Sequence, residues 1–477
     1  MRTHILICLV LTAVFGGTTS LMAQVDTTLT TEVMDSKDIE ARRAADQKEV
    51  TAANRVSENP NELPVRAIVI TKDEIKRNGY TSLVDVLKTL PGFRTSQPGS
   101  AFLGETFLMR GLLGNAYTKI LINGIPVRPS AAPGMPLAAQ LPIRQAERIE
   151  IIPGPASAAF GADAMAGVIN IVLPDVERPV EATGSVALGN GGLDEVHLYL
   201  GGKLGKGRNV LRYNFYASSR RFQDIRLGLT EDMLTVDTSE IGMNQYFAGD
   251  SVAQLRNLPH ESGMIGLSVN FRGFTYSYEN LQREDHAAIG SHASDVAFHS
   301  PFAAFGERIH SHKFKFNGES GKWNFRSNVS ALLYEVDNNS NYLGINHPIS
   351  AGNNFMYAKS NDFYAEQLIN FNLNERWDFM MGGNWNLQIG IPLYTTLDHP
   401  WDQNTAIRGP DGLPWVENAV DDELSNVSPI SPLDTYFAND IGVFGHAYFH
   451  TDRLKVIAGG RLDKPENENL FFSPKVG

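Results

Sequence analysis

Beyond residue 181, apolar and polar positions alternate along the chain. Apolar residues hold every second position in several stretches, and polar, charged or small residues hold most of the positions between them. The clearest stretches are Met264–Phe271, Arg376–Ile389 and Arg453–Asp463. A period of two predicts β-strands with one face against an apolar environment, and about twelve such strands can be counted, the last of them incomplete.

After the first hairpin, the connections between these strands alternate in length. Short turns are predicted at residues 205–207, 272–273, 319–321, 374–375 and 451–452. Long connections are predicted at residues 220–261, 282–307, 336–358 and 391–435. Short turns on one side and long loops on the other are typical of an outer-membrane barrel, whereas a soluble β-sandwich has no reason to keep this parity. Residues 181–477 are therefore predicted to form an antiparallel membrane β-barrel.

Residues 60–174 have a different pattern, which predicts a compact α+β domain. A strand-like run, Val65–Ile70, is followed by a capping box at Thr71–Glu74 and by a helix over Thr81–Leu90 that stops at Pro91-Gly92. Short strands are predicted at Thr106–Met109, Lys119–Ile122, Ile149–Ile152 and Gly167–Val172.

The first 59 residues predict two segments outside these domains. Arg2 and the short apolar run Ile5–Phe15 indicate a secretory signal over residues 1–23, since the run is too short to span a bilayer. Residues 24–59 are polar and predict a flexible leader. The single cysteine, Cys8, would leave with the signal, so neither a disulfide nor a thiolate metal site is expected.

Composition narrows the classes of function. A net charge of −12 argues against nucleic acid as a partner, because phosphates require a basic surface. Apolar residues make up 42% of the chain, which excludes disorder throughout. Beyond the signal there is no unbroken apolar run of about 18 residues, so helical membrane spans are not expected.

A dense run at residues 147–172, ERIEIIPGPASAAFGADAMAGVINIV, resembles the plug-domain signature of TonB-dependent outer-membrane receptors. Other segments match the family in order: Leu83–Phe93, Met109–Gly111 and Ile120–Val127. The resemblance is dense over residues 49–174. In the barrel it is one of pattern, apart from Phe472–Gly477, which is similar to a strand midway round such barrels.

The signature residues carried over from the family are Arg110, Gly111, Asn123, Gly124, Glu147, Arg148, Gly154, Gly161, Gly167 and Asn170. The glycines and the small residues around them permit close backbone approach, as a plug inside a barrel requires. Two positions depart from the family pattern: Asn123 replaces the usual Asp, and Pro153 the usual Arg. A phosphate loop is excluded because no Gly-Lys-Ser/Thr follows, and Ser157 lacks the Gly-x-Ser-x-Gly context of a nucleophile.

Ahead of the plug, five residues resemble the TonB box: Glu49, Val50, Thr51, Ala52 and Ala53. The resemblance implies that this extended peptide adds a strand to a TonB-type energy-transducing protein in the periplasm. It also implies that Arg110 and Arg148 lie against acidic residues of the barrel wall, in polar contacts that a moving plug can break. Solvated surface is the alternative for these arginines and for Glu147 and Glu150.

Five of the twelve histidines fall between residues 286 and 312. His310 and His312 share a face with Phe314 and Phe316, which predicts that they face lipid. His286, His292 and His299 lie in a long connection without tight ligand spacing, and are weak candidates for capture of haem or a metal. No metal site and no cofactor are predicted.

The resemblance implies a receptor of the Gram-negative outer membrane that imports a scarce ligand by energised movement of its plug, with no catalysis. Its implied partners are the TonB-type protein, outer-membrane lipid and a small extracellular ligand, with a ferric siderophore the commonest cargo in the family. Cobalamin, haem or a glycan are alternatives, and a passive porin-like or adhesion barrel is an alternative of another class. A signalling receptor would need a further folded domain before the box, for which residues 24–48 are too few.

Plugged barrels of this kind have about 22 strands, against the roughly twelve that the alternation predicts. Open sheet edges in lipid would cost on the order of tens of kcal/mol, more than the roughly 5–15 kcal/mol of a typical folding stability. We therefore expect the chain to be the N-terminal part of a longer transporter, with self-association of two halves as the alternative.

Overall fold

The computed structural model describes residues 67–477 except 162, 177, 208, 224–234, 238–250, 254–257, 291–302, 348–349, 375, 398–399, 402–406, 409–413, 416–434, 452–453, 467 and 477. The described residues all belong to one compact unit, Asp46–Gly477. The predicted signal, the leader, and Glu49 to Ala53 lie outside the described residues, as do His292 and His299.

The N-terminal domain holds two small sheets and four short helices in the described residues. The first sheet comprises β1 (Ile68–Thr71), β5 (Thr118–Ile122), β6 (Ile125–Pro126), β7 (Arg148–Pro153) and β8 (Gly167–Val172), in the order β1-β7-β8-β5-β6. The second comprises β2 (Phe93–Ser100), β3 (Gly104–Met109) and β4 (Leu112–Leu113). The helices are α3 (Lys72–Asn78), α4 (Leu83–Leu87), α5 (Gly114–Tyr117) and α6 (Ser157–Phe160).

Local capping explains where the first helices begin. Thr71 accepts a hydrogen bond from the Glu74 N–H while the Glu74 carboxylate reaches back to the Thr71 N–H, which confirms the predicted capping box. Ser82 and Asp85 form a second box at the start of α4. This helix is shorter than the predicted 81–90, because it ends at Leu87 before the turn that leads into Pro91.

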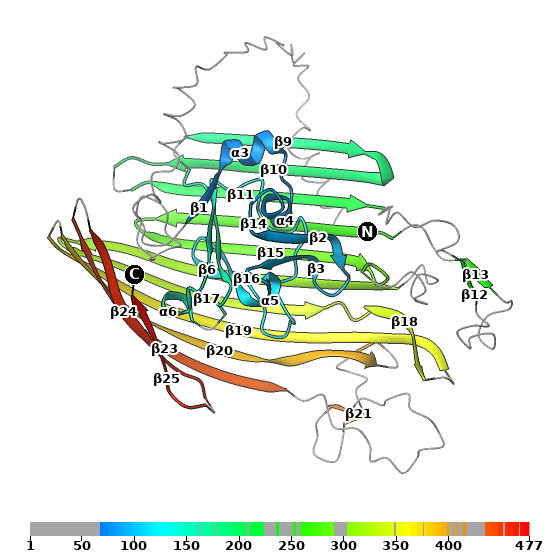
Figure 1. The fold of residues 1–477 in the computed structure, drawn as a ribbon. Coiled ribbons are helices and arrows are strands. Elements are labelled where there is room, and N and C mark those ends of the chain that lie inside the picture. The colour runs from blue at the N-terminus through cyan, green and yellow to red at the C-terminus, as the bar shows by residue number, and fades with distance from the viewer. Residues whose placement is uncertain are drawn as a thin grey trace, which may run out of the picture. The chain divides into compact units, whose positions relative to one another are not determined.

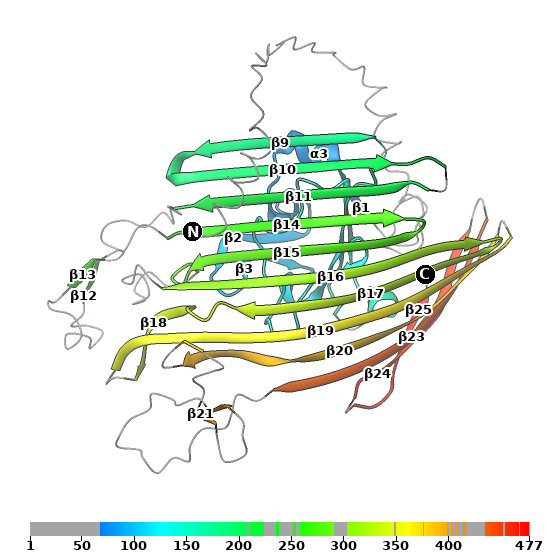
Figure 2. The same cartoon turned by 180° about the vertical axis from the view of Figure 1, so that it is seen from behind.

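Residues 180–476 form one large antiparallel sheet, which extends behind the N-terminal domain in Figure 1 and in front of it in Figure 2. Its twelve principal strands are β9 (Val180–Gly189), β10 (Leu193–Leu204), β11 (Leu211–Phe222), β14 (His260–Phe271), β15 (Phe274–His286), β16 (Ala304–Ser320), β17 (Trp323–Val336), β19 (Ser350–Asn374), β20 (Trp377–Leu397), β23 (Tyr436–His450), β24 (Lys455–Lys464) and β25 (Phe471–Val476). Each pairs with the next in this order, so the predicted strand number and antiparallel meander are confirmed.

The remaining elements lie in the connections. A 3₁₀ turn at Asn190–Gly192 joins β9 to β10, and β18 (Asn341–His347) pairs with β19 and β16. Two short hairpins are β12 (Thr235–Asp237) with β13 (Ser251–Ala253), and β21 (Ile407–Arg408) with β22 (Pro414–Trp415).

The structure confirms that short and long connections alternate, but it corrects the lengths predicted for some of the long ones. Arg272 and Gly273 form a two-residue turn in which both φ angles are positive, at 50° and 83°, as tight hairpins of right-handed twist require. The connection predicted at 282–307 is shorter, since β15 continues to His286 and β16 begins at Ala304. Most of the connection predicted at 336–358 is strand, because β18 and the first part of β19 form a hairpin there. The end of the sheet with the two-residue turns is called the short-turn end below, and the other the long-connection end.

The two faces of the sheet differ in chemistry. One face exposes large apolar side chains such as Leu267, Phe314 and Val329, as lipid contact requires. At its short-turn end, aromatic rings from neighbouring strands pair at centroid distances of 4.4 to 4.8 Å. These rings, the aromatic rim, are Phe274 with Phe316, Trp323 with Phe371, and Trp377 with Phe449. No helix among the described residues is both long and apolar enough to cross a membrane.

Candidate functional site

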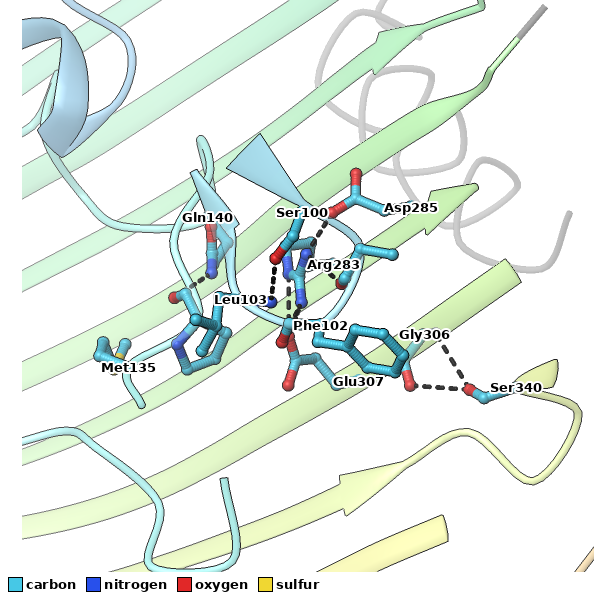
Figure 3. A network of polar contacts seen from close by, with 12 residues as sticks. Ser100, Phe102, Leu103, Met135, Gln140, Arg283, Asp285, Gly306, Glu307 and Ser340 are labelled. Carbon is cyan, nitrogen blue, oxygen red and sulfur yellow. Dashed lines mark hydrogen bonds and ion pairs between the residues drawn. The ribbon is translucent and has the colours of Figure 1, made fainter. Parts of the chain in front are cut away.

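Arg283 of β15, on the inner face of the sheet, contacts the N-terminal domain through two backbone carbonyls. Its guanidinium Nη1 donates to the carbonyl of Ala101 at 2.9 Å, and Nη2 donates to that of Phe102 at 3.3 Å. Nε donates to the carboxylate of Glu307 on β16 at 2.8 Å, and Nη1 also bonds Asp285. Figure 3 shows the guanidinium between these two carboxylates and the loop at Ser100–Leu103.

This group is buried, and most of its donors are paired. The Arg283 side chain has no exposed area, and Glu307 accepts a further hydrogen bond from the Tyr334 hydroxyl at 2.7 Å. His260 bonds the other carboxylate, Asp285. A buried ion is stable only when its hydrogen bonds are made. Arg283 therefore donates not only to the two carboxylates but also to backbone carbonyls of the N-terminal domain. The cluster therefore fixes that loop to the sheet.

The loop can approach Arg283 only because Gly104 has no side chain. Its φ is +66°, and a Cβ at this position would lie 2.0 Å from the carbonyl oxygen of Leu137 and 3.0 Å from Arg283 Nη1. The connection after β15 also reaches this loop, since the Ala101 N–H donates to the carbonyl of Ile289 at 2.9 Å. The loop at Ser100–Leu103 is therefore contacted both by β15 and by the connection that follows it.

Other polar contacts join the two domains away from this cluster. The Ser130 N–H donates to Asp362 on β19 at 2.9 Å, and its hydroxyl lies 2.5 Å from that of Tyr436 on β23. Arg144 lies 3.3 Å from the carboxylate of Glu195 on β10. Arg220 of β11 donates to the Thr81 hydroxyl at 2.8 Å.

Beyond these contacts, one part of the interface is apolar. The apolar belt is a set of buried inward side chains on β11 to β17 that share one cluster with the core of the N-terminal domain: Tyr216, Met264, Leu281, Ile309, Leu332 and Tyr334. Four of them continue across neighbouring strands in register, Met264 opposite Leu281, Leu281 opposite Ile309, and Ile309 opposite Tyr334. The plug therefore meets the sheet through apolar side chains as well as through polar contacts.

The predicted signature residues form the turns and polar centre of the first sheet. Asn123 has a φ of +53° and accepts a hydrogen bond from the Leu173 N–H at 2.8 Å, and Gly124 has a φ of +84°. The Gly124 N–H donates to Asn170, whose amide donates to the buried Glu150 at 3.1 Å. Asn123 in place of Asp therefore keeps both the left-handed backbone and the acceptor.

Three of the remaining signature glycines lie close to other groups, and the fourth, Gly111, lies in open space. A Cβ on Gly167 would lie 2.3 Å from the Ile152 carbonyl oxygen. A Cβ on Gly154 would lie 3.2 Å from the Arg110 guanidinium, and one on Gly161 would lie 3.4 Å from that of Arg461 on β24. Gly111 has a φ of +82° in the turn between β3 and β4.

The predicted pairing of Arg110 and Arg148 with acidic residues of the sheet is corrected. Arg148 lies 2.8 Å from Glu150, two residues along the same strand, because side chains at i and i+2 share one face of a strand. Arg110 is exposed and has no ion pair within the described residues. Glu147 lies 3.2 Å from Lys72 of the N-terminal domain.

Two carboxyl groups of the N-terminal domain have shifted pKa values. The Gln97 amide donates to both, to Glu105 at 2.8 Å and to Asp85 at 3.1 Å. Burial raises the pKa of Glu105, and neighbouring Asp85 raises it further. Burial also acts to raise the pKa of Asp85, but hydrogen bonds from Lys88, Gln97 and the backbone outweigh it and hold that pKa well below its ordinary value.

Two histidines, His310 and His312, are placed as the alternation predicted, whereas His286 ends β15 and does not lie in a connection. His310 and His312 lie on the lipid-facing side of β16, where their rings contact the hydroxyls of Tyr278 and Tyr276 at 2.9 and 3.0 Å. His286 is buried and accepts a hydrogen bond from the Ala288 N–H at 3.1 Å. In the described part of the chain, no three His, Cys, Asp or Glu side chains are grouped so as to hold a metal.

Arg283, Asp285 and Glu307 were not identified from the sequence, because they fall in the segment 282–307 that was predicted to be a connection. The available signal was their alternation: Arg283 and Asp285 are two residues apart at a strand end, so both point inward. Their pairing with Glu307 depends on the register of β15 and β16, which the sequence does not reveal.

Comparison with known proteins agrees with this arrangement. Residues 59–168 match the TonB-dependent Receptor Plug Domain family. A vitamin B12 transporter of Vibrio vulnificus is 35% identical over 141 residues, which are 30% of this chain and 23% of that protein. The chain thus spans about a quarter of the length of that relative.

Two solved structures share the fold at low sequence identity. A mutant of the ferric enterobactin receptor of Pseudomonas aeruginosa superposes with a TM-score of 0.62 at 17% identity, over 90% of this chain and 61% of that one. The pyoverdine outer-membrane receptor of Pseudomonas aeruginosa gives 0.61 at 13% identity, over 90% and 62%. The plug match identifies residues 59–168 as a TonB-dependent receptor plug domain, and the two solved structures show that the chain shares the fold of outer-membrane receptors.

Proposed function

We propose that this receptor imports a ferric siderophore by energised movement of the plug, with residues 49–53 as the segment that a TonB-type partner grips. The observation that carries the proposal is the attachment of the plug through Arg283, which bonds two backbone carbonyls of one plug loop. Such hydrogen bonds hold the plug at rest, and each contributes only about 0.5–3 kcal/mol, so an applied force can break them one at a time. The proposal includes no catalytic step.

A siderophore as cargo is supported by the two structural relatives, which are named for ferric enterobactin and pyoverdine. Cobalamin is the second candidate, and it is supported by the sequence relative, which is named as a vitamin B12 transporter. The two cargoes can be separated with a deletion strain. Loss of growth on ferric siderophores under iron limitation supports the first, and loss of growth that depends on scarce cobalamin supports the second.

Energy coupling is tested by Thr51→Pro in the same strain. Proline removes a backbone N–H and cannot donate to a partner's sheet edge. Uptake should be abolished while ligand binding at the cell surface remains. Thr51→Ser, which keeps the N–H, should take up ligand normally. Unchanged uptake by Thr51→Pro would place the coupling segment elsewhere.

A further inference from the structure

A second polar region lies between plug and sheet at the short-turn end, beyond the apolar belt. It is a cavity of about 190 Å³ bounded by the plug turn at Asn123–Ile125, the segment Leu173–Val176 and the inner faces of β11, β14, β15 and β16. Its wall includes a polar row in register across three strands, Asn270 opposite Thr275 and Thr275 opposite Lys315. We call this cavity the chamber.

The charges of the chamber do not balance. Lys313 lies 2.5 Å from Glu279, and Arg212 lies 3.4 Å from Asp175, so both carboxylates that line the chamber already have a cation beside them. Lys315 is half-buried in the same wall and has neither an ion pair nor a hydrogen bond within the described residues. Arg326 of β17 is a further cation whose charge acts on Lys315. One positive charge of the chamber is therefore left over.

We propose that the chamber is an oxyanion-binding site in which the Lys315 ammonium is the anchor. An ammonium group has three donors and no acceptor, so its natural partner in a polar cavity is a carboxylate, a phosphate or a similar oxygen anion. Drug-sized ligands occupy pockets of about 300–1,000 Å³. The chamber is smaller, and it fits a single acidic group or a small free anion.

The position of the chamber suggests its use, and this step depends on the proposed function. Lys315 and Arg283 lie on the same inner face of the sheet, and the apolar belt separates them. Lys315 is opposite Thr275, which is eight positions along β15 from Arg283. At the usual strand rise, eight positions place Thr275 about 27 Å from Arg283. A ligand that enters at the long-connection end meets the chamber only after it has passed the belt. The chamber then holds the acidic group of the ligand on the exit side, so an anionic ligand is the class that the wall favours.

The site is tested by titrating inorganic phosphate into the purified receptor in detergent and measuring heat. We expect saturable binding that Lys315→Gln weakens by about tenfold, equivalent to 1.4 kcal/mol. Lys315→Arg should bind within about threefold of wild type, because it keeps the charge. Lys206→Gln, in the exposed turn at Gly205–Gly207, is the matched control and should leave binding unchanged.

Heat-modifiable migration of each variant verifies folding. No phosphate binding by wild type, or equal binding by wild type and Lys315→Gln, overturns the site. The transit role has its own measurement: Lys315→Gln should lower the maximal rate of ligand uptake by cells without changing surface binding. Unchanged uptake overturns the transit role but leaves the anion site. If wild-type cells take up no ligand while phosphate still binds, the proposed function fails and the site stands.

Discussion

The two ends of the plug–sheet interface are built in opposite ways. At the long-connection end, Arg283 is fully buried, and both neighbouring carboxylates and two plug carbonyls take its hydrogen bonds. At the short-turn end, Lys315 faces a cavity and has no partner within the described residues. The plug is attached to the sheet where β15 and the connection after it contact the loop at Ser100–Leu103. At the plug turn Asn123–Ile125, the chamber separates the plug from the sheet.

This difference teaches which contacts resist movement of the plug. A buried charge cluster depends on correct placement, because removal of one member leaves the others buried without a partner. A polar cavity adapts more easily, since water can replace a displaced side chain. Resistance to displacement should therefore be concentrated at Arg283, and substitutions at the chamber should affect the plug through its own turn.

The largest expected effect is that of Arg283→Met. The substitution keeps the volume but leaves Asp285 and Glu307 buried without their cation, which should lower the free energy of unfolding of the plug by about 3–5 kcal/mol. Thermal unfolding in detergent measures the loss. Cells that carry the variant should also admit large antibiotics. Arg308→Met, an outward-facing arginine on β16, is the control, and an equal loss of stability there would abolish the distinction between the two ends.

An intermediate effect is expected at the chamber, from Asn123→Ala. Alanine tolerates the left-handed backbone poorly and leaves the Leu173 N–H without its acceptor, which together should lower stability by about 2 kcal/mol. Asn123→Asp, the residue usual in the family, keeps the acceptor and should remain close to wild type. Asn123→Gly relieves only the backbone strain and should lie between them. If aspartate were as damaging as alanine, the hydrogen bond would not be the cause.

The smallest effect should have the opposite sign. Burial raises the pKa of Glu105, so its contribution to stability is present below the ordinary pKa of 4.5 and is lost as pH rises through the folded-state pKa. Glu105→Gln should therefore raise the melting temperature slightly at pH 7, and the gain should vanish near pH 4.5. A gain from Glu105→Gln that persists in acid would exclude protonation as its cause.

Asp85 has a lowered pKa, so its carboxylate stabilises the plug at pH values above its ordinary pKa of 3.8. Asp85→Asn should therefore lower the melting temperature at pH 7.

Local patterns predicted the fold well where they were strong. The Gly167–Val172 strand has the predicted bounds, and the turn at Arg272-Gly273 follows from one glycine between two alternating runs. The region 336–358 was predicted as a long connection between two alternating stretches. It is largely strand because β18 and β19 pair with each other, and pairing supplies hydrogen bonds that no single-residue preference reports.

The candidate site was harder to predict, because its residues are brought together by the register between neighbouring strands. Met264 shares a strand face with Gly266, Ser268 and Asn270, yet it is buried and belongs to the apolar belt. The arginines singled out by resemblance are plug residues, and Arg148 finds its partner within its own strand. The arginine that joins plug and sheet is Arg283, whose partners come from β16 and from a loop about 180 residues earlier. Such a constellation is visible only after the strands are aligned.

The aromatic rim also sets how deeply the sheet lies in the bilayer. Rings such as Trp323 and Trp377 favour the boundary between lipid and water, and here each lies tilted against a ring on an adjacent strand. Because the rim is made of strand residues at the short-turn end, it sets the height of the sheet in the bilayer from that side. Insertions and deletions in the long connections then change the surface at that end of the sheet without raising or lowering the chamber, the belt or Arg283. The long connections can diverge while the part that holds the plug keeps its level.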